Sequence, residues 1–128
     1  MRIYKEFFLE AAHLLPSAPA GHPNARVHGH SFRVRVAVDG EPAADTGVVV
    51  HFDDLEGAIA DARDALDHRF LNEVEGLSAP TLERIAIWLW ERLKDRLPGL
   101  AEIQVARDTC HEGCVYTGPR ACATRAAE

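Results

Sequence analysis

The sequence predicts an α+β protein in which an antiparallel sheet is covered by two helices on one face. The prediction rests on the order of the hydrophobic patterns, which runs strand, strand, strand, helix, helix, strand, strand. Both helical patterns lie next to each other in the chain, with strand patterns on either side. This segregation of helices from strands is typical of the α+β class. The other face of the sheet would be open to a ligand or to an oligomeric partner.

Three strands are expected ahead of the helices. Aromatic, aliphatic and polar residues mix over 3–13, and the prolines and glycine of 14–27 indicate a loop. Phenylalanine and valine then alternate with arginine and alanine over 32–38, which predicts a strand with one buried and one basic face. After a polar turn at 39–42, the run Gly-Val-Val-Val-His-Phe at 47–52 is expected to return as a strand and to form an antiparallel hairpin.

Two amphipathic helices are expected next. Asp53 is placed to cap the first, in which leucine, isoleucine and alanine recur at helical spacing as far as Leu66. Thr81 is placed to cap the second, which Pro98-Gly99 stops. The interior stripes of both helices indicate that each buries one side against the sheet.

Two further strands are expected near the end of the chain, at 103–107 and 115–117, joined by a turn through 111–113. The alanine-rich tail after Gly118 has no pattern and is expected to be frayed. A chain of 128 residues is long enough for one hydrophobic core, so we expect a single domain over 1–128.

Composition excludes several classes of protein. The net charge of −6 and the lack of a basic tract argue against nucleic-acid binding. No apolar run approaches the roughly 20 residues that span a bilayer, and the first residues lack the hydrophobic region of a signal peptide. The cysteines are odd in number and gathered in the last fifth of the chain, which favours a reducing cytoplasm over a disulfide framework: Cys110, Cys114 and Cys122.

Three histidines form the principal candidate site. His28 and His30 are separated by Gly29, and residues i and i+2 of a strand point to the same face. A third histidine, His13, ends the first expected strand. Three neutral imidazoles with an open fourth position are what a catalytic zinc site requires. Affinity order alone favours copper, but an all-imidazole site in a cytosolic protein most often means zinc. Solvated imidazoles in a loop are the alternative.

Two aspartates, Asp67 and Asp108, are candidate functional residues because of their neighbours in the sequence. Asp67 precedes His68 at the end of the first helix, where it can orient the imidazole as a general base. A charged helix C-terminus is the alternative explanation. Asp108 and Thr109 follow the strand at 103–107, and a carboxylate there can grip a guanidine-like ligand edge through two parallel hydrogen bonds. Ordinary turn chemistry is the alternative.

The remaining histidines and cysteines have weaker signals. His22 lies in the proline-rich loop, which can bring it over the metal, and His51 ends an expected strand. Cys110 and Cys114, with His111 between them, resemble half of a structural zinc site, but no second pair exists. We expect these thiols to pack as small hydrophobic side chains instead.

Several short motifs occur in one order between Phe7 and Gly118. They are Glu10-Ala11-Ala12-His13, Gly21-His22, His28-Gly29-His30-Ser31-Phe32, Leu66-Asp67-His68 with Leu71-Asn72, Pro80-Thr81-Leu82-Glu83, and Asp108-Thr109-Cys110 leading to Gly113-Cys114-Val115-Tyr116. Together they resemble the 6-pyruvoyl-tetrahydropterin synthase family. Within this family, the chain more closely resembles the branch of bacterial 6-carboxytetrahydropterin synthase.

This resemblance implies a T-fold, with a four-stranded antiparallel sheet and two helices packed on one face. It implies trimers that stack into a homohexamer, with active sites at subunit interfaces, and zinc on His13, His28 and His30. The implied substrate is 7,8-dihydroneopterin triphosphate, whose side-chain hydroxyls chelate the metal and become more acidic. Asp67 and His68 match the family's aspartate and histidine, which assist a catalytic cysteine.

The chain departs from the family at three positions. The family cysteine lies four residues before the first histidine of His-Gly-His, where this chain has Asn24. An amide cannot accept that proton, and losing a positioned base costs about 10²–10⁴ in rate. Asp108, beside Thr109, matches the glutamate that anchors the pterin but is one methylene shorter. His51 stands where relatives commonly carry an aspartate before phenylalanine.

The sequence thus predicts a zinc-dependent pterin lyase or synthase of the 6-carboxytetrahydropterin synthase type, cytoplasmic and active in queuosine biosynthesis. Its catalytic residues would be His68, oriented by Asp67 as the acid or base, and Asp108, which would also hold the pterin together with Thr109. Two alternatives stay open. One is a retro-aldol enzyme that cleaves the pterin side chain to a hydroxymethyl or aldehyde pterin, and the other is a non-catalytic relative that binds zinc or pterin.

Overall fold

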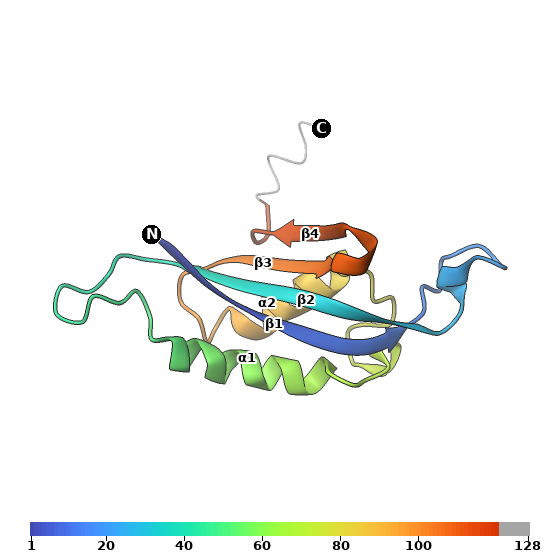
Figure 1. Ribbon diagram of the computed structural model, residues 1–128, viewed down its shortest axis with the longest axis horizontal. Helices are drawn as coiled ribbons and strands as arrows, with labels where there is room; N and C mark the ends of the chain where they lie inside the picture. Colours follow the sequence, from blue (N-terminus) through green and yellow to red (C-terminus); the bar gives the residue numbers. More distant parts are fainter. Residues whose placement is uncertain (121–128) are drawn as a thin grey trace.

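A four-stranded antiparallel sheet with two helices on one face forms the body of the protein (Figure 1). The computed structural model describes residues 1–120. The strands lie in the sheet in chain order, and both helices fall between the second and third strands: β1 (Arg2–His13), β2 (His28–Asp39), α1 (Phe52–Leu66), α2 (Leu82–Leu93), β3 (Leu100–Arg107) and β4 (Glu112–Tyr116). The predicted α+β fold is confirmed.

The long hairpin of β1 and β2 determines where the candidate site lies. The two strands pair without interruption from Arg2 opposite Asp39 to His13 opposite His28. Residues 14–27 connect them at the histidine end, with one short 3₁₀ turn at Pro23–Ala25. This connection confirms the predicted loop and places it directly beside the candidate metal ligands.

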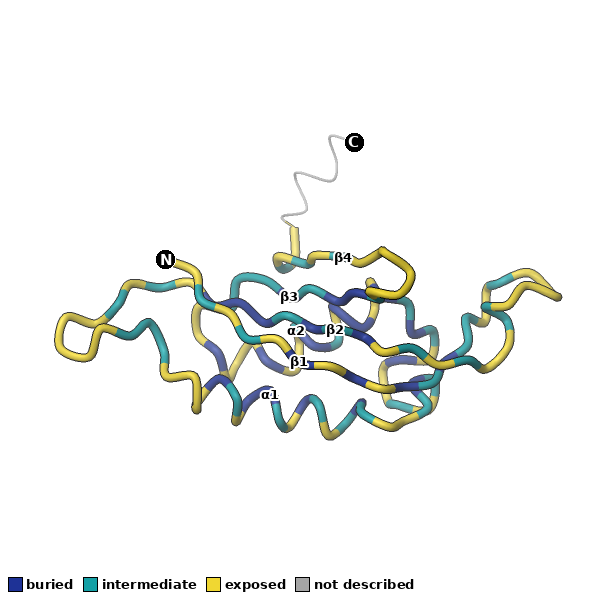
Figure 2. The backbone as a smooth tube through the Cα atoms, viewed as in Figure 1, coloured by how far each residue is buried: buried dark blue, intermediate teal, exposed yellow. Residues whose placement is uncertain are grey.

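Alternation along β1 and β2 separates a covered face from an open face of the sheet. On β1, Phe7 and Leu9 are buried under the helices while Phe8 between them is exposed. On β2, Phe32 is buried and Arg33 lies on the open side. Figure 2 shows the resulting change between buried and exposed positions along these strands. The core therefore lies between the covered face and the two helices.

Each helix buries a stripe of small and branched apolar residues at helical spacing. In α1 these are Leu55, Ala58, Ile59, Ala62 and Leu66, and in α2 they are Leu82, Ile85, Ala86, Leu89 and Leu93. The hydroxyl of Thr81 accepts a hydrogen bond from the amide of Arg84 at 3.2 Å, so the predicted cap of α2 is confirmed. A cap of this kind contributes about 1 kcal/mol.

The strand predicted at 47–52 is wrong. β2 already pairs with β1 along one edge and with β3 along the other, so it has no edge left for a further partner. The chain instead closes a small loop, in which the amide of Gly47 donates to the carbonyl of Ala43 at 2.7 Å and that of Ala43 to Val48 at 3.0 Å. Val50 is half-buried and packs against the core, which explains the apolar run without a strand.

Asp53 does not cap α1, contrary to the prediction. His51 is the cap residue, without a side-chain hydrogen bond, and the helix begins at Phe52. Asp53 lies in the first turn, where a negative charge still favours the helix N-terminus. The ends of other elements shift by a few residues, since α2 ends at Leu93 and β4 begins at Glu112.

The tail predicted to be frayed lies mostly, from residue 121 onward, outside the described part of the chain. Within residues 1–120, no helix is long and apolar enough to cross a membrane.

Candidate metal centre

The sheet register brings the three predicted histidines together at one end of the covered face. His13 and His28 are direct partners across β1 and β2, and His30 follows two residues later on the same face of β2. His13 is buried, with only 1% of its surface exposed. The register of the β1–β2 hairpin thus places His13, the last residue of β1, beside the His-Gly-His that begins β2.

The three imidazoles face one another at short range. Their ring centroids lie 4.5 Å apart for His13 and His28, 5.1 Å for His13 and His30, and 4.8 Å for His28 and His30. One nitrogen from each ring can be chosen so that all three lie within 4.8 Å of one another. Nitrogens that share a tetrahedral zinc at about 2.0–2.1 Å are roughly 3.3 Å apart, so the rings have to close by about 1.5 Å or less.

Backbone carbonyls determine which nitrogen is free in two of the rings. Nδ1 of His13 donates to the carbonyl of Pro80 at 2.9 Å, and Nδ1 of His28 donates to the carbonyl of Arg26 at 2.7 Å. A carbonyl only accepts, so both rings carry their proton on Nδ1 and keep a lone pair on Nε2. This arrangement of an outer acceptor orienting a ligand imidazole is typical of metal sites.

The free nitrogens are buried and lack partners. Among the described residues, Nε2 of His13, His28 and His30 are all buried without a hydrogen bond. Buried polar atoms are nearly always satisfied, so three buried nitrogens without a partner, two of them fixed as acceptors, indicate a site for a shared ligand. Three neutral imidazole donors match the ligand set of a zinc centre that keeps a fourth position open. The residues present therefore fit the metal that the sequence predicts.

The surroundings favour the neutral form of His13 and His30. Burial lowers the pKa of His30 to about 4, with further lowering from His13, Arg107 and His28. The pKa of His13 is also lowered, mainly by burial, although its bond to Pro80 opposes the shift. Neutral imidazole is the form that binds metal, so the pocket favours the ligand state even at acidic pH.

Arg107 is a neighbour of this centre that the sequence patterns did not indicate. It lies at the end of β3, and its Nη2 pairs with Glu112 of β4 at 2.6 Å. Its Nε is a fourth buried nitrogen without a partner, and its charge lowers the pKa of His13 and His30. From sequence alone, an arginine at the end of a strand is expected to be exposed. Only the structure shows that Arg107 lies near the histidines.

Asp67 and His68 form the expected pair, outside the histidine cluster. Nδ1 of His68 lies 3.1 Å from Oδ2 of Asp67, whose other oxygen accepts from the amide of Glu10 at 2.9 Å. The hydrogen bond from the amide of Glu10 is the main cause that holds the pKa of Asp67 below its usual range. The contact with His68 lowers it further. His68 has a left-handed backbone (φ 59°) and a side chain that is 78% exposed. The imidazole is thus oriented by a carboxylate and open to a ligand.

Asp108 lies at the opposite side of the sheet from the histidines. It begins the 3₁₀ turn Asp108–Cys110 after β3, and both of its oxygens accept hydrogen bonds from Arg33 on the open face. This bond raises the pKa of Arg33. Thr109 is next in the same turn, where its hydroxyl lies 4.0 Å from the sulfur of Cys110. Asp108, which is predicted to bind the pterin, is therefore already paired with Arg33 in this structure.

One chain therefore holds three separate groups. Within residues 1–120, no hydrogen bond or ion pair joins the histidine cluster to the pair of Asp67 and His68 or to Asp108. The first group lies on the covered face and the third on the open face. The second lies beside the outer edge of β1, where Phe70 bridges to Ala12.

The other candidate residues have local structural roles. Nδ1 of the exposed His22 accepts from the amide of Asn24 at 3.0 Å, and the carbonyl of Asn24 accepts from Leu15 at 2.8 Å. The backbone at position 24 is thus held within the loop that connects β1 and β2 at the histidine end. His51 caps α1.

The cysteines behave differently from one another. Cys114 is half-buried against the core, and this burial raises the pKa of its thiol, as expected for a packing role. Cys110 is exposed, so the same prediction is wrong for it, because the turn Asp108–Cys110 turns it outward. Cys122 lies outside the described residues.

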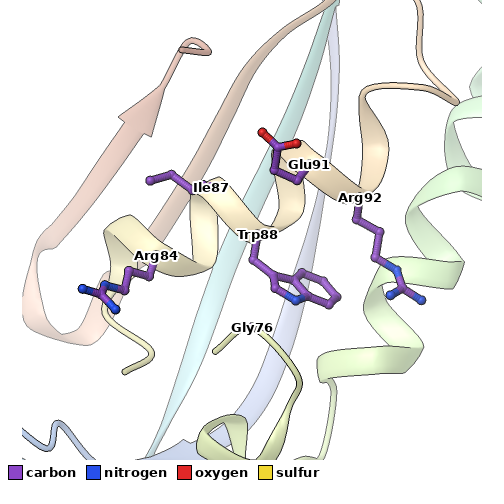
Figure 3. A pocket seen from close by; sticks show the side chains of 6 residues that line it. All are labelled: Gly76, Arg84, Ile87, Trp88, Glu91 and Arg92. Atoms are coloured by element: carbon purple, nitrogen blue, oxygen red, sulfur yellow. The ribbon is translucent and has the colours of Figure 1, made fainter. Parts of the chain in front are cut away.

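A surface groove of about 540 Å³ lies away from all three groups, on the outer side of α2 (Figure 3). Trp88 forms part of its wall, with its indole N–H donating to the carbonyl of Glu75 at 3.0 Å and Arg92 over its ring at 5.1 Å. The groove contains no histidine, cysteine or aspartate, so it offers no chemistry like that of the metal centre.

Comparison with known proteins agrees with the fold and gives the family. A family model described as 6-pyruvoyl tetrahydropterin synthase matches residues 2–119. The chain belongs to this family. Its sequence is 40% identical over 124 residues to 6-carboxy-5,6,7,8-tetrahydropterin synthase of Synechocystis, covering 92% of this chain and 94% of that protein. It is 37% identical over 87 residues to dihydroneopterin monophosphate aldolase of Pyrococcus furiosus, covering 68% and 71% of the two chains.

The fold is also that of a solved family structure. The 6-pyruvoyl tetrahydropterin synthase of Caenorhabditis elegans superposes with a TM-score of 0.84 at 24% identity, covering 93% of this chain and 96% of the other. The T-fold implied by the sequence motifs is thereby confirmed.

Proposed function

We propose that this chain is a zinc-dependent lyase or synthase that converts 7,8-dihydroneopterin triphosphate to 6-carboxytetrahydropterin. The observation that carries the proposal is the three-histidine cluster in a chain that is 40% identical to a 6-carboxytetrahydropterin synthase over nearly its whole length. Cytoplasmic location, a role in queuosine biosynthesis and a single domain over 1–128 stay predictions that accompany it.

His13, His28 and His30 would hold the zinc through Nε2. When bound, the metal supplies Lewis acidity, which makes the hydroxyls of a bound pterin side chain easier to deprotonate. The protein contributes fixed tautomers on His13 and His28 and a buried setting on the covered face. Among residues 1–120 this cluster offers three imidazoles and no further ligand, so a bound zinc would keep a position for substrate.

His68 is the proposed acid or base. Because Asp67 accepts from its Nδ1, the neutral ring keeps an unprotonated Nε2 that can receive a proton from substrate. Asp67 also stabilises the imidazolium that forms, and it stays ionised because the amide of Glu10 lowers its pKa. Asp108 and Thr109 are the proposed grip on the aminopyrimidine edge of the pterin.

A homo-oligomer, trimeric or hexameric, would bring these groups together. The support is twofold: the groups lie apart in one chain, and within residues 1–120 the outer edges of β1 and β4 have no strand partner. Paired edges between copies would close the sheet and remove both exposed edges. The active site would then combine residues from different subunits.

The retro-aldol alternative has a specific observation in its favour. One relative is named dihydroneopterin monophosphate aldolase and shares 37% identity with this chain over 87 residues. Asn24, in place of the family cysteine, also removes a base that the synthase reaction uses. Side-chain cleavage needs one deprotonated hydroxyl, so it depends less on that base.

Product analysis tests these functions directly. Zinc-loaded protein is incubated with 7,8-dihydroneopterin triphosphate and the pterins are separated by chromatography. A carboxypterin supports the proposal, and a hydroxymethyl or aldehyde pterin supports the alternative. Binding without turnover indicates a non-catalytic relative. The His28→Ala variant is the control, because any product that it still makes at the wild-type rate does not depend on the metal centre.

The Asn24→Cys variant tests the role of the missing base. Its backbone position is held by bonds to His22 and Leu15, so the new thiol would stand where the loop already lies. If cysteine is the absent component, carboxypterin formation rises by about 10²-fold or more. No gain in that product would show that position 24 does not separate this chain from its relatives.

A further inference from the structure

Arg33 already occupies the carboxylate that is proposed to grip the pterin. Its Nε donates to Oδ2 of Asp108 at 3.0 Å and to Oδ1 at 3.2 Å, and its Nη2 donates to Oδ1 at 3.2 Å. One guanidinium therefore covers both oxygens. This is the fork arrangement in which arginine recognises carboxylates with most specificity.

A guanidinium and the aminopyrimidine edge of a pterin present the same chemistry. Each carries adjacent, coplanar N–H donors on a guanidine-like unit, and each can bind a carboxylate through two parallel bonds. A carboxylate receives one such fork along the side toward which both of its oxygens point. Arg33 and a pterin ligand thus require the same position on Asp108.

Arg33 also has a second set of partners that a ligand would leave intact. Its Nη1 donates to Oε2 of Glu6 on β1 at 2.9 Å and to Oε1 of Gln104 on β3 at 3.2 Å. Glu6 in turn accepts from Arg35 at 3.0 Å. If a ligand takes Asp108, the guanidinium keeps a charged acceptor, so the exchange does not leave an unpaired charge on the sheet.

A hollow on the open face lies beside this pair. It has a volume of about 410 Å³, and its lining includes Arg33, Gln104, Ala106, Asp108 and His111. That volume falls in the range of small-molecule sites, roughly 300–1,000 Å³. Because Arg33 and Asp108 both line the hollow, a flat ring placed there would meet the carboxylate and the guanidinium together.

We infer that Arg33 is a specificity-determining residue that binds Asp108 in place of the ligand and is exchanged for the aminopyrimidine edge when a pterin binds. The inference rests on the proposed function, since it takes Asp108 as the pterin grip. Only a ligand that donates two parallel bonds replaces those that Asp108 loses, so ligands with a single donor compete less well with Arg33. Asp108 is 52% exposed. Pairs this exposed are weak, so we expect Arg33 to lower pterin affinity about fivefold.

The inference is tested by titrating the zinc-loaded protein against neopterin. The affinity is measured from the quenching of pterin fluorescence. We expect Arg33→Met and Arg33→Gln each to bind neopterin about fivefold more tightly than wild type. Arg35→Met is the matched control, because Arg35 shares Glu6 but does not contact Asp108. Its affinity should equal that of wild type. A 2-oxo analogue, which lacks the amino donor, should gain at least as much from either Arg33 variant, because its single bond to Asp108 no longer competes with the guanidinium. A merely structural role of Arg33 would not narrow the difference in affinity between the two ligands.

Other outcomes overturn the inference and separate it from the proposed function. If Asp108→Asn loses neopterin binding while the Arg33 variants bind more weakly or unchanged, Arg33 orients the carboxylate instead of competing for it, and the proposed function stands. If Asp108→Asn binds as wild type does, the pterin is held elsewhere and the inference fails, while product analysis decides the function separately. If the wild type does not bind neopterin, both fail together.

Discussion

The two faces of the sheet hold their polar groups in opposite states. On the covered face, Nε2 of His13, His28 and His30 is buried and unpartnered. On the open face, Arg33 and Asp108 satisfy each other. Both groups are candidate binding sites in the same chain, and they lie on the same two-stranded hairpin or at the strand next to it.

This difference indicates what each face requires from a ligand. Unpartnered buried nitrogens gain a bond when a metal arrives and lose none, so the covered face is prepared for binding. A satisfied ion pair has to be exchanged, so the open face gains only the difference between two sets of bonds. Tight binding belongs to the first arrangement, and discrimination between similar ligands belongs to the second.

The largest expected effect is loss of metal from the covered face. Replacing His28 by alanine removes one of three ligands, and we expect zinc affinity to fall on the order of 1,000-fold or more, beyond the 10–100-fold typical of an outer partner. Metal analysis of protein prepared without chelators, and competition with a chelator of known affinity, measure this. His51→Ala is the control, because His51 lies at the cap of α1 away from the cluster. Equal zinc content in His28→Ala and wild type would refute the site.

Adjacent phenylalanines on β1 compare the stability of the two faces. Phe7 is 7% exposed on the covered face and Phe8 is 55% exposed on the open face. We expect Phe7→Ala to lower the free energy of unfolding by about 3–5 kcal/mol and Phe8→Ala by about 1 kcal/mol or less. Denaturant titration of both variants measures the difference.

The same pair of variants tests the proposed oligomer. If Phe8 is covered by another subunit, its replacement costs more than about 1 kcal/mol and the loss depends on protein concentration. Equal, concentration-independent losses for Phe7→Ala and Phe8→Ala would contradict the assignment of the two faces.

Hydrophobic periodicity was sufficient to predict most elements of the fold and the face of the sheet that the helices cover. The alternation in β2 and the helical spacing in α1 and α2 predicted the elements because each buries a continuous apolar stripe. The apolar run at 47–52 misled for the same reason, since half-buried valines in a loop give the same pattern as a strand. The sequence near 47–52 cannot show that both edges of β2 are occupied, because the strand order depends on the whole sheet.

The candidate site divides in a similar way. The His-Gly-His spacing predicts two ligands on one face from local geometry, and the structure brings His13 to them. The roles of Arg33 and Arg107 were not predictable, because Arg33 meets Asp108 75 residues further along the chain and Arg107 acts on His13 and His30, which lie on other strands. Sequence thus indicates ligands that share a strand, while partners that meet across strands appear only with the register.

A pH titration of the metal-free protein tests the covered face with a smaller expected effect. Burial lowers the pKa of His13 and brings that of His30 to about 4, below the unfolded value near 6.5. The unfolded chain therefore binds more protons than the folded one between these values, and stability falls as the pH drops from 6.5 toward 4. We expect a loss of about 1–2 kcal/mol between pH 7 and pH 5, after allowing for solvent screening.

Denaturant unfolding at each pH measures this loss, above the range in which carboxylates titrate. His30→Gln is the matched variant, and it should show a shallower decline because the glutamine does not titrate. A decline of equal steepness in His30→Gln would show that the histidine cluster does not cause it.

The smallest expected effect concerns how the two faces orient their ligands. Arg33 orients Asp108 through a side chain, whereas His13 is oriented by the carbonyl of Pro80, directly before the cap of α2. Thr81→Ala removes the cap, so we expect the free energy of unfolding to fall by about 1 kcal/mol. The loosened carbonyl should also weaken zinc binding by less than about tenfold, the low end for an outer partner. Thr81→Ser keeps the hydroxyl and should restore both quantities. If Thr81→Ala destabilises the fold but leaves zinc affinity unchanged, the start of α2 supports the core alone, and the metal centre depends only on the β1–β2 register.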